Sequence, residues 1–334
     1  MKQVVEIKDE EILELVNSYE DAEIYHHPCW KKILEEVFGF KSICLATKDA
    51  YLPFMYIEPS IFSKKSAVSL PIVTSAGLLG SQDKLSLFLD YLKEKNFKKA
   101  VIKQFSSPLF KDKIETSHAE YRRELKSEED IWRGLNKGKK SDVNSAKKEN
   151  YRVVISKGED SNIDRFYLLY LKKMREFGTP PLPKEMFVKL SECFKDKFDM
   201  FEIYGGDDLI GVTICIGFKD IYYYIYVAFD TVFTRKFKHV QVYMIYRMML
   251  EGLNLGYKYF SFGRSTKNSS QAKTKRYMGA DEIDIYTYDI DLVSMGVEPK
   301  MQSQKDFKLA IKLWKILPLK LTEFLGKPVR KFLL

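Results

Sequence analysis

Side chains that could carry chemistry gather in one stretch near the end of the chain, residues 257–280, with the sequence YKYFSFGRSTKNSSQAKTKRYMGA. The aromatic first part predicts a strand, and Gly263 then allows a turn or a close approach of the backbone to a ligand. Arg264 and Ser265 follow at once, with further cations close behind: Lys267, Lys273, Lys275 and Arg276. Because open α/β sheets bind ligands at the carboxyl ends of their strands, this cluster predicts a site for a group that carries or gains negative charge.

The composition is that of a globular protein with room for two domains. The chain has 334 residues, of which 45% are hydrophobic and 30% charged. Its net charge of +9 favours an anionic partner such as a nucleic acid, an acidic membrane face or a phosphorylated substrate. Four scattered cysteines and four histidines offer no local zinc spacing, so we expect no metal and a reducing, cytoplasmic location.

Apolar periodicity predicts the same kind of α/β unit in both halves of the chain. The first half has predicted helices at 10–18, 29–37 and 83–95, and predicted strands at 42–47, 51–58, 67–70 and 100–103. The second half has predicted helices at 163–177, 185–194 and 240–255, and predicted strands at 151–156, 200–204, 209–218, 221–229 and 257–262. The short turns between the strands at 200–229 indicate an antiparallel meander.

A resemblance to a known family rests on these residues. Gly263-Arg264-Ser265-Thr266, followed by Lys275 and Gly279-Ala280, resembles the signature of the FemAB-like branch of the GNAT acyltransferases. Shorter stretches elsewhere are similar to further segments of that family: His27-Pro28-x-Trp30 with Phe38-Gly39, Ser69-Leu70-Pro71 with Gly77, and Trp314 with Leu317-Pro318 and Leu325-Gly326. The resemblance implies a duplicated GNAT fold and acyl transfer from an aminoacyl-tRNA to an amine of a peptidoglycan precursor.

Lys275 stands where the family has the lysine of its signature, although Thr274 and Met278 replace two of the family's aromatic residues. We expect Lys275 to be the catalytic cation that stabilises a developing oxyanion or holds the donor ester; the alternative is a surface lysine in a basic loop. Arg264 and Ser265 are expected to bind substrate, with a structural ion pair as the alternative for Arg264.

Coenzyme A is disfavoured as the donor, and no cofactor is expected. The usual coenzyme A enzymes hold the pyrophosphate on a glycine-rich loop that opens the helix after the meander. Here that position has the sequence RKFKHV at 235–240, which contains no glycine. Bulky side chains would obstruct the backbone approach. The resemblance to FemAB-like proteins implies an aminoacyl-tRNA as the donor instead.

Two further groups are candidates for substrate binding. Alternation in the strand at 221–229 places Tyr222, Tyr224 and Tyr226 on one face, where Tyr224 and Tyr226 could line an acceptor site or simply pack in the core. In the basic segment 131–148, Lys139 and Lys140 could bind phosphates or belong to a solvated helix face. His239 could act as a general base, although no partner for it is evident.

The tail from residue 305 has eight basic and two acidic residues. Helical spacing places Lys308, Lys312 and Lys315 on one stripe, with Trp314 on the apolar face. These four residues are expected to contact an anionic membrane surface; the alternative is a helix docked on its own domain. No apolar run in the sequence is long enough to span a membrane.

The sequence therefore predicts an α/β (α+β) protein of two GNAT-like domains, each a mixed, mostly antiparallel sheet flanked by helices. The predicted boundaries are 1–117 for the first domain, 118–292 for the second, which carries the site, and 293–334 for a basic amphipathic tail. The predicted function is acyl or aminoacyl transfer to a cell-envelope precursor at the cytoplasmic membrane face. The alternatives are a non-catalytic anion- or nucleic-acid-binding protein and a coenzyme A-dependent N-acetyltransferase.

Overall fold

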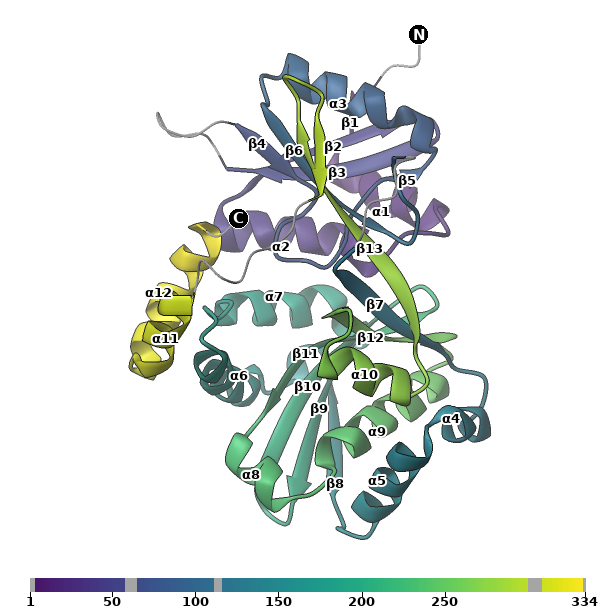
Figure 1. Ribbon diagram of the computed structural model, residues 1–334, viewed down its shortest axis with the longest axis vertical. Coiled ribbons are helices and arrows are strands. Elements are labelled where there is room, and N and C mark those ends of the chain that lie inside the picture. Colours follow the sequence, from purple (N-terminus) through teal and green to yellow (C-terminus); the bar gives the residue numbers. More distant parts are fainter. Residues whose placement is uncertain (1–3, 58–64, 111–115, 300–307, 333–334) are drawn as a thin grey trace. The chain divides into compact units, whose positions relative to one another are not determined.

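The computed structural model describes residues 4–57, 65–110, 116–299 and 308–332, and these form two compact units (Figure 1). Unit 1 is built from the chain up to Ala119 together with the segment that begins at Ile283. Unit 2 is built from Glu120–Glu282 together with the C-terminal helices.

Unit 1 is a mostly antiparallel sheet flanked by helices. Its strands lie in the order β1-β2-β3-β4-β6-β13; among the described strands of this path, β4 and β6 pair in parallel and the other neighbours are antiparallel. The helices are α1 (Asp9–Ser18), α2 (Pro28–Phe38) and α3 (Leu85–Glu94). The strands are β1 (Val5–Glu6), β2 (Lys41–Thr47), β3 (Ala50–Tyr56), β4 (Ser66–Val68), β5 (Leu79–Gly80), β6 (Lys99–Phe105), β13 (Asp281–Asp291) and β14 (Val297–Pro299).

The apolar face of α3 closes the core of unit 1. Phe88 and Leu92 are fully buried, among residues of β2, β3 and β6 such as Leu52 and Ile102. Burying side chains of this size contributes roughly 1.5–3 kcal/mol each, and this places α3 firmly on the sheet.

Unit 2 repeats this arrangement with a larger sheet, in the order β7-β12-β11-β10-β9-β8. Its strands are β7 (His118–Glu124), β8 (Arg152–Lys157), β9 (Phe198–Gly205), β10 (Asp208–Phe218), β11 (Ile221–Phe229) and β12 (Tyr259–Thr266). Its helices are α4 (Glu128–Gly134), α5 (Lys137–Lys147), α6 (Ile163–Phe177), α7 (Lys184–Phe194), α8 (Thr231–Lys236), α9 (Val240–Asn254), α10 (Ser270–Tyr277), α11 (Lys308–Ile316) and α12 (Leu319–Phe332).

Helices cover both faces of the unit 2 sheet. On one face Met248 of α9 contacts Thr213 and Cys215 of β10. On the other, Phe187 of α7 packs against Tyr226 of β11, and α6 packs alongside. A sheet covered on both faces has nearly continuous apolar strands, as in β10, where Ile210 through Phe218 are all buried.

Strands β11 and β12 diverge, and this divergence positions the site. They pair in parallel from Ile221 opposite Tyr259 to Tyr223 opposite Ser261. Within the described residues no registered pair joins the two strands beyond that point, although β11 continues to Phe229 and β12 to Thr266. We call this place the fork; it lies at the carboxyl ends of two parallel strands, where α/β sheets bind ligands.

The predicted α/β class, with mostly antiparallel sheets flanked by helices, is confirmed. The structure differs from the predicted boundaries in two segments. Strand β13 pairs with β6, so residues from Ile283 belong to unit 1, and α11 and α12 pack on α6 within unit 2. Strands β7 and β13 and helix α10 were not predicted from the sequence.

Candidate functional site

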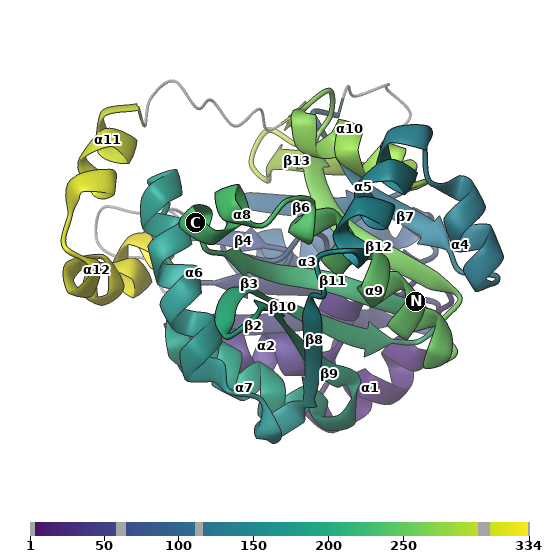
Figure 2. The same cartoon turned by 90° about the horizontal axis from the view of Figure 1, so that it is seen from below.

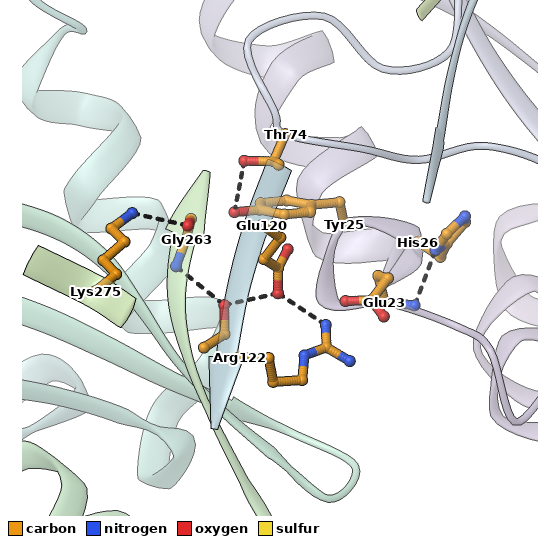
Figure 3. Close-up of polar contacts among 9 residues, drawn as sticks. Glu23, Tyr25, His26, Thr74, Glu120, Arg122, Gly263 and Lys275 are labelled. Atoms are coloured by element: carbon orange, nitrogen blue, oxygen red, sulfur yellow. Dashed lines mark hydrogen bonds and ion pairs between the residues drawn. The ribbon is translucent and has the colours of Figure 1, made fainter. Parts of the chain in front are cut away.

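Lys275, the predicted catalytic residue, lies on α10 with its side chain directed back to the end of β12 (Figure 3). Its Nζ donates hydrogen bonds to the main-chain oxygens of Gly263, at 2.8 Å, and Arg264, at 3.2 Å. An ammonium group has three N–H donors, so one makes no hydrogen bond among the described residues, and the centroid of the Tyr121 ring lies 5.5 Å from Nζ. Lys275 is thereby held at the fork with one donor available to a ligand.

The backbone around Lys275 has a specific geometry. Gly263 has a φ of 69°, in the left-handed region, and its amide donates to Ser261 Oγ at 3.2 Å. This conformation turns the Gly263 carbonyl to Lys275. An L side chain rarely adopts such a φ, which accounts for glycine at this position.

Both ends of α10 are anchored. Ser269 caps the first turn by accepting a hydrogen bond from the amide of Ala272. At the other end Arg123 donates to the main-chain oxygen of Met278 at 2.6 Å, and a Cβ on Gly279 would lie 2.2 Å from this guanidinium. A glycine is therefore needed at position 279, because the Arg123 guanidinium occupies the space that a side chain would enter.

Burial lowers the pKa of Lys275 from its usual 10.5 to about 8, opposed by the Glu120 carboxylate and reinforced by the positive charge of Arg264. At neutral pH the ammonium form still prevails. A partly desolvated cation attracts a nearby negative charge more strongly than one in water.

A buried polar network supports the fork from β7 (Figure 3). Glu120, only 2% exposed, accepts hydrogen bonds from Ser261 Oγ and from Arg122, each at 2.8 Å. Ser261 in turn accepts the bond from the Gly263 amide. The network thus fixes the turn that presents the Gly263 carbonyl to Lys275.

Sequence reasoning missed Glu120 and Arg122. The segment HAEYRRE at 118–124 is too charged to resemble a strand. The alternation of residue types along this segment was the available signal for a strand. Glu120 and Arg122 fall on one face of a strand and Tyr121 on the other. The charges are buried because they pair with one another.

The other predicted cations separate around α10. Arg276 pairs with Glu282 at 2.7 Å and Lys267 with the same carboxylate at 3.8 Å. Arg264 and Lys273 are exposed, and Ser265 is partly exposed near the end of β12. Of the cations in this cluster, Lys275 is the one that donates hydrogen bonds to the main-chain oxygens of Gly263 and Arg264 among the described residues.

A β-bulge divides the tyrosines of β11. Tyr226 pairs with Ile214, whereas Tyr224 pairs with the next residue of β10, Cys215, so Ile225 is the extra residue. Tyr224 therefore lies on the α9 face, stacked on Phe260, and Tyr226 lies on the α7 face. The prediction that Tyr222, Tyr224 and Tyr226 lie on one face is wrong, because the extra residue of the bulge reverses the alternation of side chains between the two faces.

The basic segment forms α5, which packs against α9 through Val143 and Ala146. Lys139 pairs with Asp142 at 2.7 Å, and Lys140 donates to the main-chain oxygen of Arg133 at 3.0 Å. Both lysines, predicted to bind phosphates, thus make contacts within their own segment. Asp142 also contacts His239 Nδ1 at 3.0 Å. Asp142 is thus a partner of His239 that the sequence did not reveal.

Side chains fill the turn before α9. A Cβ on Gly205 would lie 2.5 Å from the nearest atom of the Phe237 ring, so this ring occupies the space beside the glycine. The same ring packs against Tyr151. Tyr151 donates its hydroxyl hydrogen to the main-chain oxygen of Lys238 at 2.9 Å. His239 follows at the N-cap in the left-handed region.

The tail helices lie along α6 (Figure 2). Trp314, a predicted membrane contact, is only 9% exposed, and the neighbouring Ile311 packs on Gly178. Lys312 and Lys315 are exposed. Lys308 begins α11, and its side chain lies outside the described residues.

The corresponding place in unit 1, beyond the parallel pair β4–β6, is filled by the loop 69–78. Lys103 of β6 donates from Nζ to the main-chain oxygens of Leu70, at 3.3 Å, and Val73, at 3.2 Å. Gln104 exchanges two side-chain hydrogen bonds with the backbone of Leu78. His26 contacts the Gly77 oxygen at 3.0 Å and accepts from the Glu23 amide, and Tyr25 accepts a hydrogen bond from Thr74 (Figure 3).

The described residues contain neither a metal-binding cluster nor a membrane-spanning helix. No group of three or more histidine, cysteine, aspartate or glutamate side chains is placed to hold a metal ion. Among the helices of that same part of the chain, none combines the length and apolar character needed to cross a bilayer.

Comparison with known proteins finds a family model that matches part of this chain. Residues 133–275 match the family model described as an acetyltransferase (GNAT) domain. This match begins at Arg133 in α4 and ends at Lys275 itself. A comparison with curated protein sequences found no match.

Solved structures share the fold over most of the chain. The crystal structure of FemX has a TM-score of 0.64 at 12% identity, over 92% of this chain and 100% of that one. The C-terminal domain of a putative lysylphosphatidylglycerol synthetase from Agrobacterium fabrum has a TM-score of 0.55 at 9% identity, over 84% and 92%. A tandem GNAT protein from the clavulanic acid biosynthesis pathway has a TM-score of 0.50 at 6% identity, over 90% and 99%. Such identities show the fold alone, and the fold is that of two GNAT-like domains.

Proposed function

We propose that this chain, whose residues 133–275 match an acetyltransferase (GNAT) domain model, transfers an aminoacyl group from an activated ester to an amine of a cell-envelope precursor. The observation that carries the proposal is the Lys275 ammonium, held at the fork by two main-chain oxygens with one N–H to spare. The fold shared with FemX supports the substrate class.

Attack of an amine on an ester carbonyl turns the carbonyl oxygen into an oxyanion. A fixed cation aimed at that oxygen stabilises the transition state more than the ground state. Lys275 meets this requirement because its two bonds to Gly263 and Arg264 set its position before substrate arrives. The new C–N bond forms in the attack. When the tetrahedral intermediate collapses, the C–O bond of the ester breaks, and the proton given up by the amine nitrogen passes to the alkoxide leaving group.

The donor we propose is an aminoacyl-tRNA rather than coenzyme A. Pyrophosphate binding at the start of α9 would need exposed main-chain amides. In this protein Phe237 packs on Gly205 there, and the sequence 235–240 has no glycine. Exposed Arg264, beside the fork on β12, provides positive charge for a polyanionic donor.

The acceptor we propose is the amine of a peptidoglycan precursor, modified at the cytoplasmic face of the membrane. The relationship in fold to FemX and to the lysylphosphatidylglycerol synthetase domain supports an envelope substrate. We assign Tyr224 and Ser265, which lie on the two strands of the fork, to the acceptor side of the site.

The test is a transfer assay with the full chain, a mixture of charged tRNAs and a water-soluble peptidoglycan-precursor peptide that carries a free amine. The product is measured by mass spectrometry. We expect Lys275→Ala to reduce the rate by about a hundred- to a thousandfold, which is typical for loss of an oxyanion-stabilising group.

Lys273→Ala is the matched control, because Lys273 lies on the same helix but is exposed. It should retain nearly full activity. Full activity of a folded Lys275→Ala protein would refute the role of Lys275. Transfer from acetyl coenzyme A in place of charged tRNA would overturn the proposed donor while leaving acyl transfer intact.

A further inference from the structure

The tail helices α11 and α12 present large apolar side chains to solvent. On α11 these are Leu309, Leu313 and Ile316, which are 70%, 54% and 77% exposed. On α12 they are Leu321, Phe324 and Phe332, which are 40%, 77% and 89% exposed. Their spacing of three, four or eight residues places each set on one side of its helix. We call these six residues the outer stripe.

A second face of each helix is already used within unit 2. Trp314 and Thr322 are buried, and a Cβ on Gly326 would lie 2.8 Å from Pro181. Arg330 donates to the main-chain oxygen of Pro180 at 2.7 Å. The tail is therefore docked on its own unit, and the outer stripe is what this docking leaves uncovered.

The outer stripe is bordered by positive charge. Lys312, Lys315 and Lys320 are exposed and alternate with its apolar members. Only Glu323 adds an acidic side chain to the described part of the tail. Apolar side chains that insert between acyl chains, with lysines at the headgroup level, form the arrangement by which helices bind anionic lipid surfaces.

We propose that the outer stripe docks the protein on an anionic lipid surface, with α11 and α12 lying in the plane of the interface. Charge decides between this occupant and a second copy of the chain. Two copies meeting face to face would bring Lys312, Lys315 and Lys320 toward their own equivalents, and this repulsion disfavours self-association. The proposal assigns the contact to the outer stripe and assigns Trp314 to the docked face.

This inference rests on the proposed function only in expecting that the reaction takes place at a membrane. Its test measures lipid binding and involves no turnover. Flotation of the full chain is compared on vesicles of phosphatidylcholine alone and vesicles that contain phosphatidylglycerol. We expect binding to the anionic vesicles, and loss of that binding in the triple variant Leu313→Ser/Ile316→Ser/Phe324→Ser. Each of Lys312→Gln and Lys315→Gln should weaken it by about fivefold.

Val293→Ser is the matched control, since Val293 is 66% exposed in unit 1. It should bind as the unmodified chain does, and circular dichroism should show that all variants are folded. Equal flotation of the triple variant, absence of binding by the unmodified chain, or a dimer abolished by the triple variant would each overturn the proposal. The transfer assay uses a water-soluble acceptor, so it can succeed where flotation fails.

Discussion

The two units of this protein contain the same parallel strand pair and end it differently. In unit 1, β4 and β6 are paired from Ser66 opposite Lys99 to Val68 opposite Val101. In unit 2, β11 and β12 are paired from Ile221 opposite Tyr259 to Tyr223 opposite Ser261. Each pair is connected through a helix, α3 in unit 1 and α9 in unit 2.

Beyond the pair, the loop 69–78 binds to β6 in unit 1. The Ser69 amide donates to the oxygen of Val101, Ser75 donates to that of Lys103, and Gln104 holds Leu78. At the corresponding place in unit 2, the Lys275 side chain donates a hydrogen bond to the Gly263 oxygen of β12. Unit 1 thus covers this edge with its own backbone, whereas in the described part of unit 2 the Lys275 ammonium binds there.

The two lysines show what this difference means. Lys103 and Lys275 each donate to two main-chain oxygens. Lys103 holds a loop whose residues Leu70 and Val73 are buried, so its bonds contribute to stability. Lys275 binds the turn of a strand end, and we propose that its remaining donor serves catalysis. Similar hydrogen bonding therefore has different consequences in the two units.

The largest effect on stability is expected in the network under the fork. Glu120→Ala removes the buried carboxylate that pairs with Arg122 at 2.8 Å. Removing one partner of a buried ion pair costs about 3–5 kcal/mol. Urea unfolding should show this loss, and Glu124→Ala, at an exposed position of the same strand, should change stability far less. Equal losses in both variants would contradict the role of the network.

A smaller effect is expected in unit 1. Lys103→Met keeps most of the aliphatic side chain but leaves the main-chain oxygens of Leu70 and Val73 without this donor. We expect the free energy of unfolding to fall by about 1–3 kcal/mol. The transfer rate of the folded variant should stay unchanged. A transfer rate reduced as strongly as in Lys275→Ala would mean that unit 1 takes part in the chemistry.

The sequence predicted most of the regular structure because apolar periodicity reports burial directly. Helix α6 and strand β11 have the predicted bounds, 163–177 and 221–229. Strand β7 was missed because its buried charges pair with each other, which a hydrophobic pattern does not reveal. Strand β13, with the sequence DEIDIYTYDID, carries a readable alternation that sequence reasoning did not use.

The candidate site was predicted in part. The signature located Lys275 and Gly263 near one strand end, and the structure joins them through a hydrogen bond. Glu120 lies more than a hundred residues earlier in the chain, and no local spacing could connect it with Ser261. The bulge at Ile225, which separates Tyr224 from Tyr226, likewise depends on pairing with β10. Long-range pairing is what the sequence alone did not provide.

The smallest expected effect is a shift in pH dependence, which tests whether Lys275 acts as a cation. The acceptor amine must lose its proton to attack, so the transfer rate first rises with pH. Since burial lowers the pKa of Lys275 to about 8, the ammonium is lost as pH rises through that value, and the rate should then fall about tenfold per pH unit.

Two substitutions identify the group responsible for this fall. Lys275→Arg should remove it from the accessible range, because a guanidinium stays charged. Glu120→Gln removes the negative charge that raises the pKa of Lys275, so the fall should begin at lower pH. Lys273→Arg, the exposed control on α10, should leave the profile in place. A fall near pH 8 that persists in Lys275→Arg would assign the titration to another group.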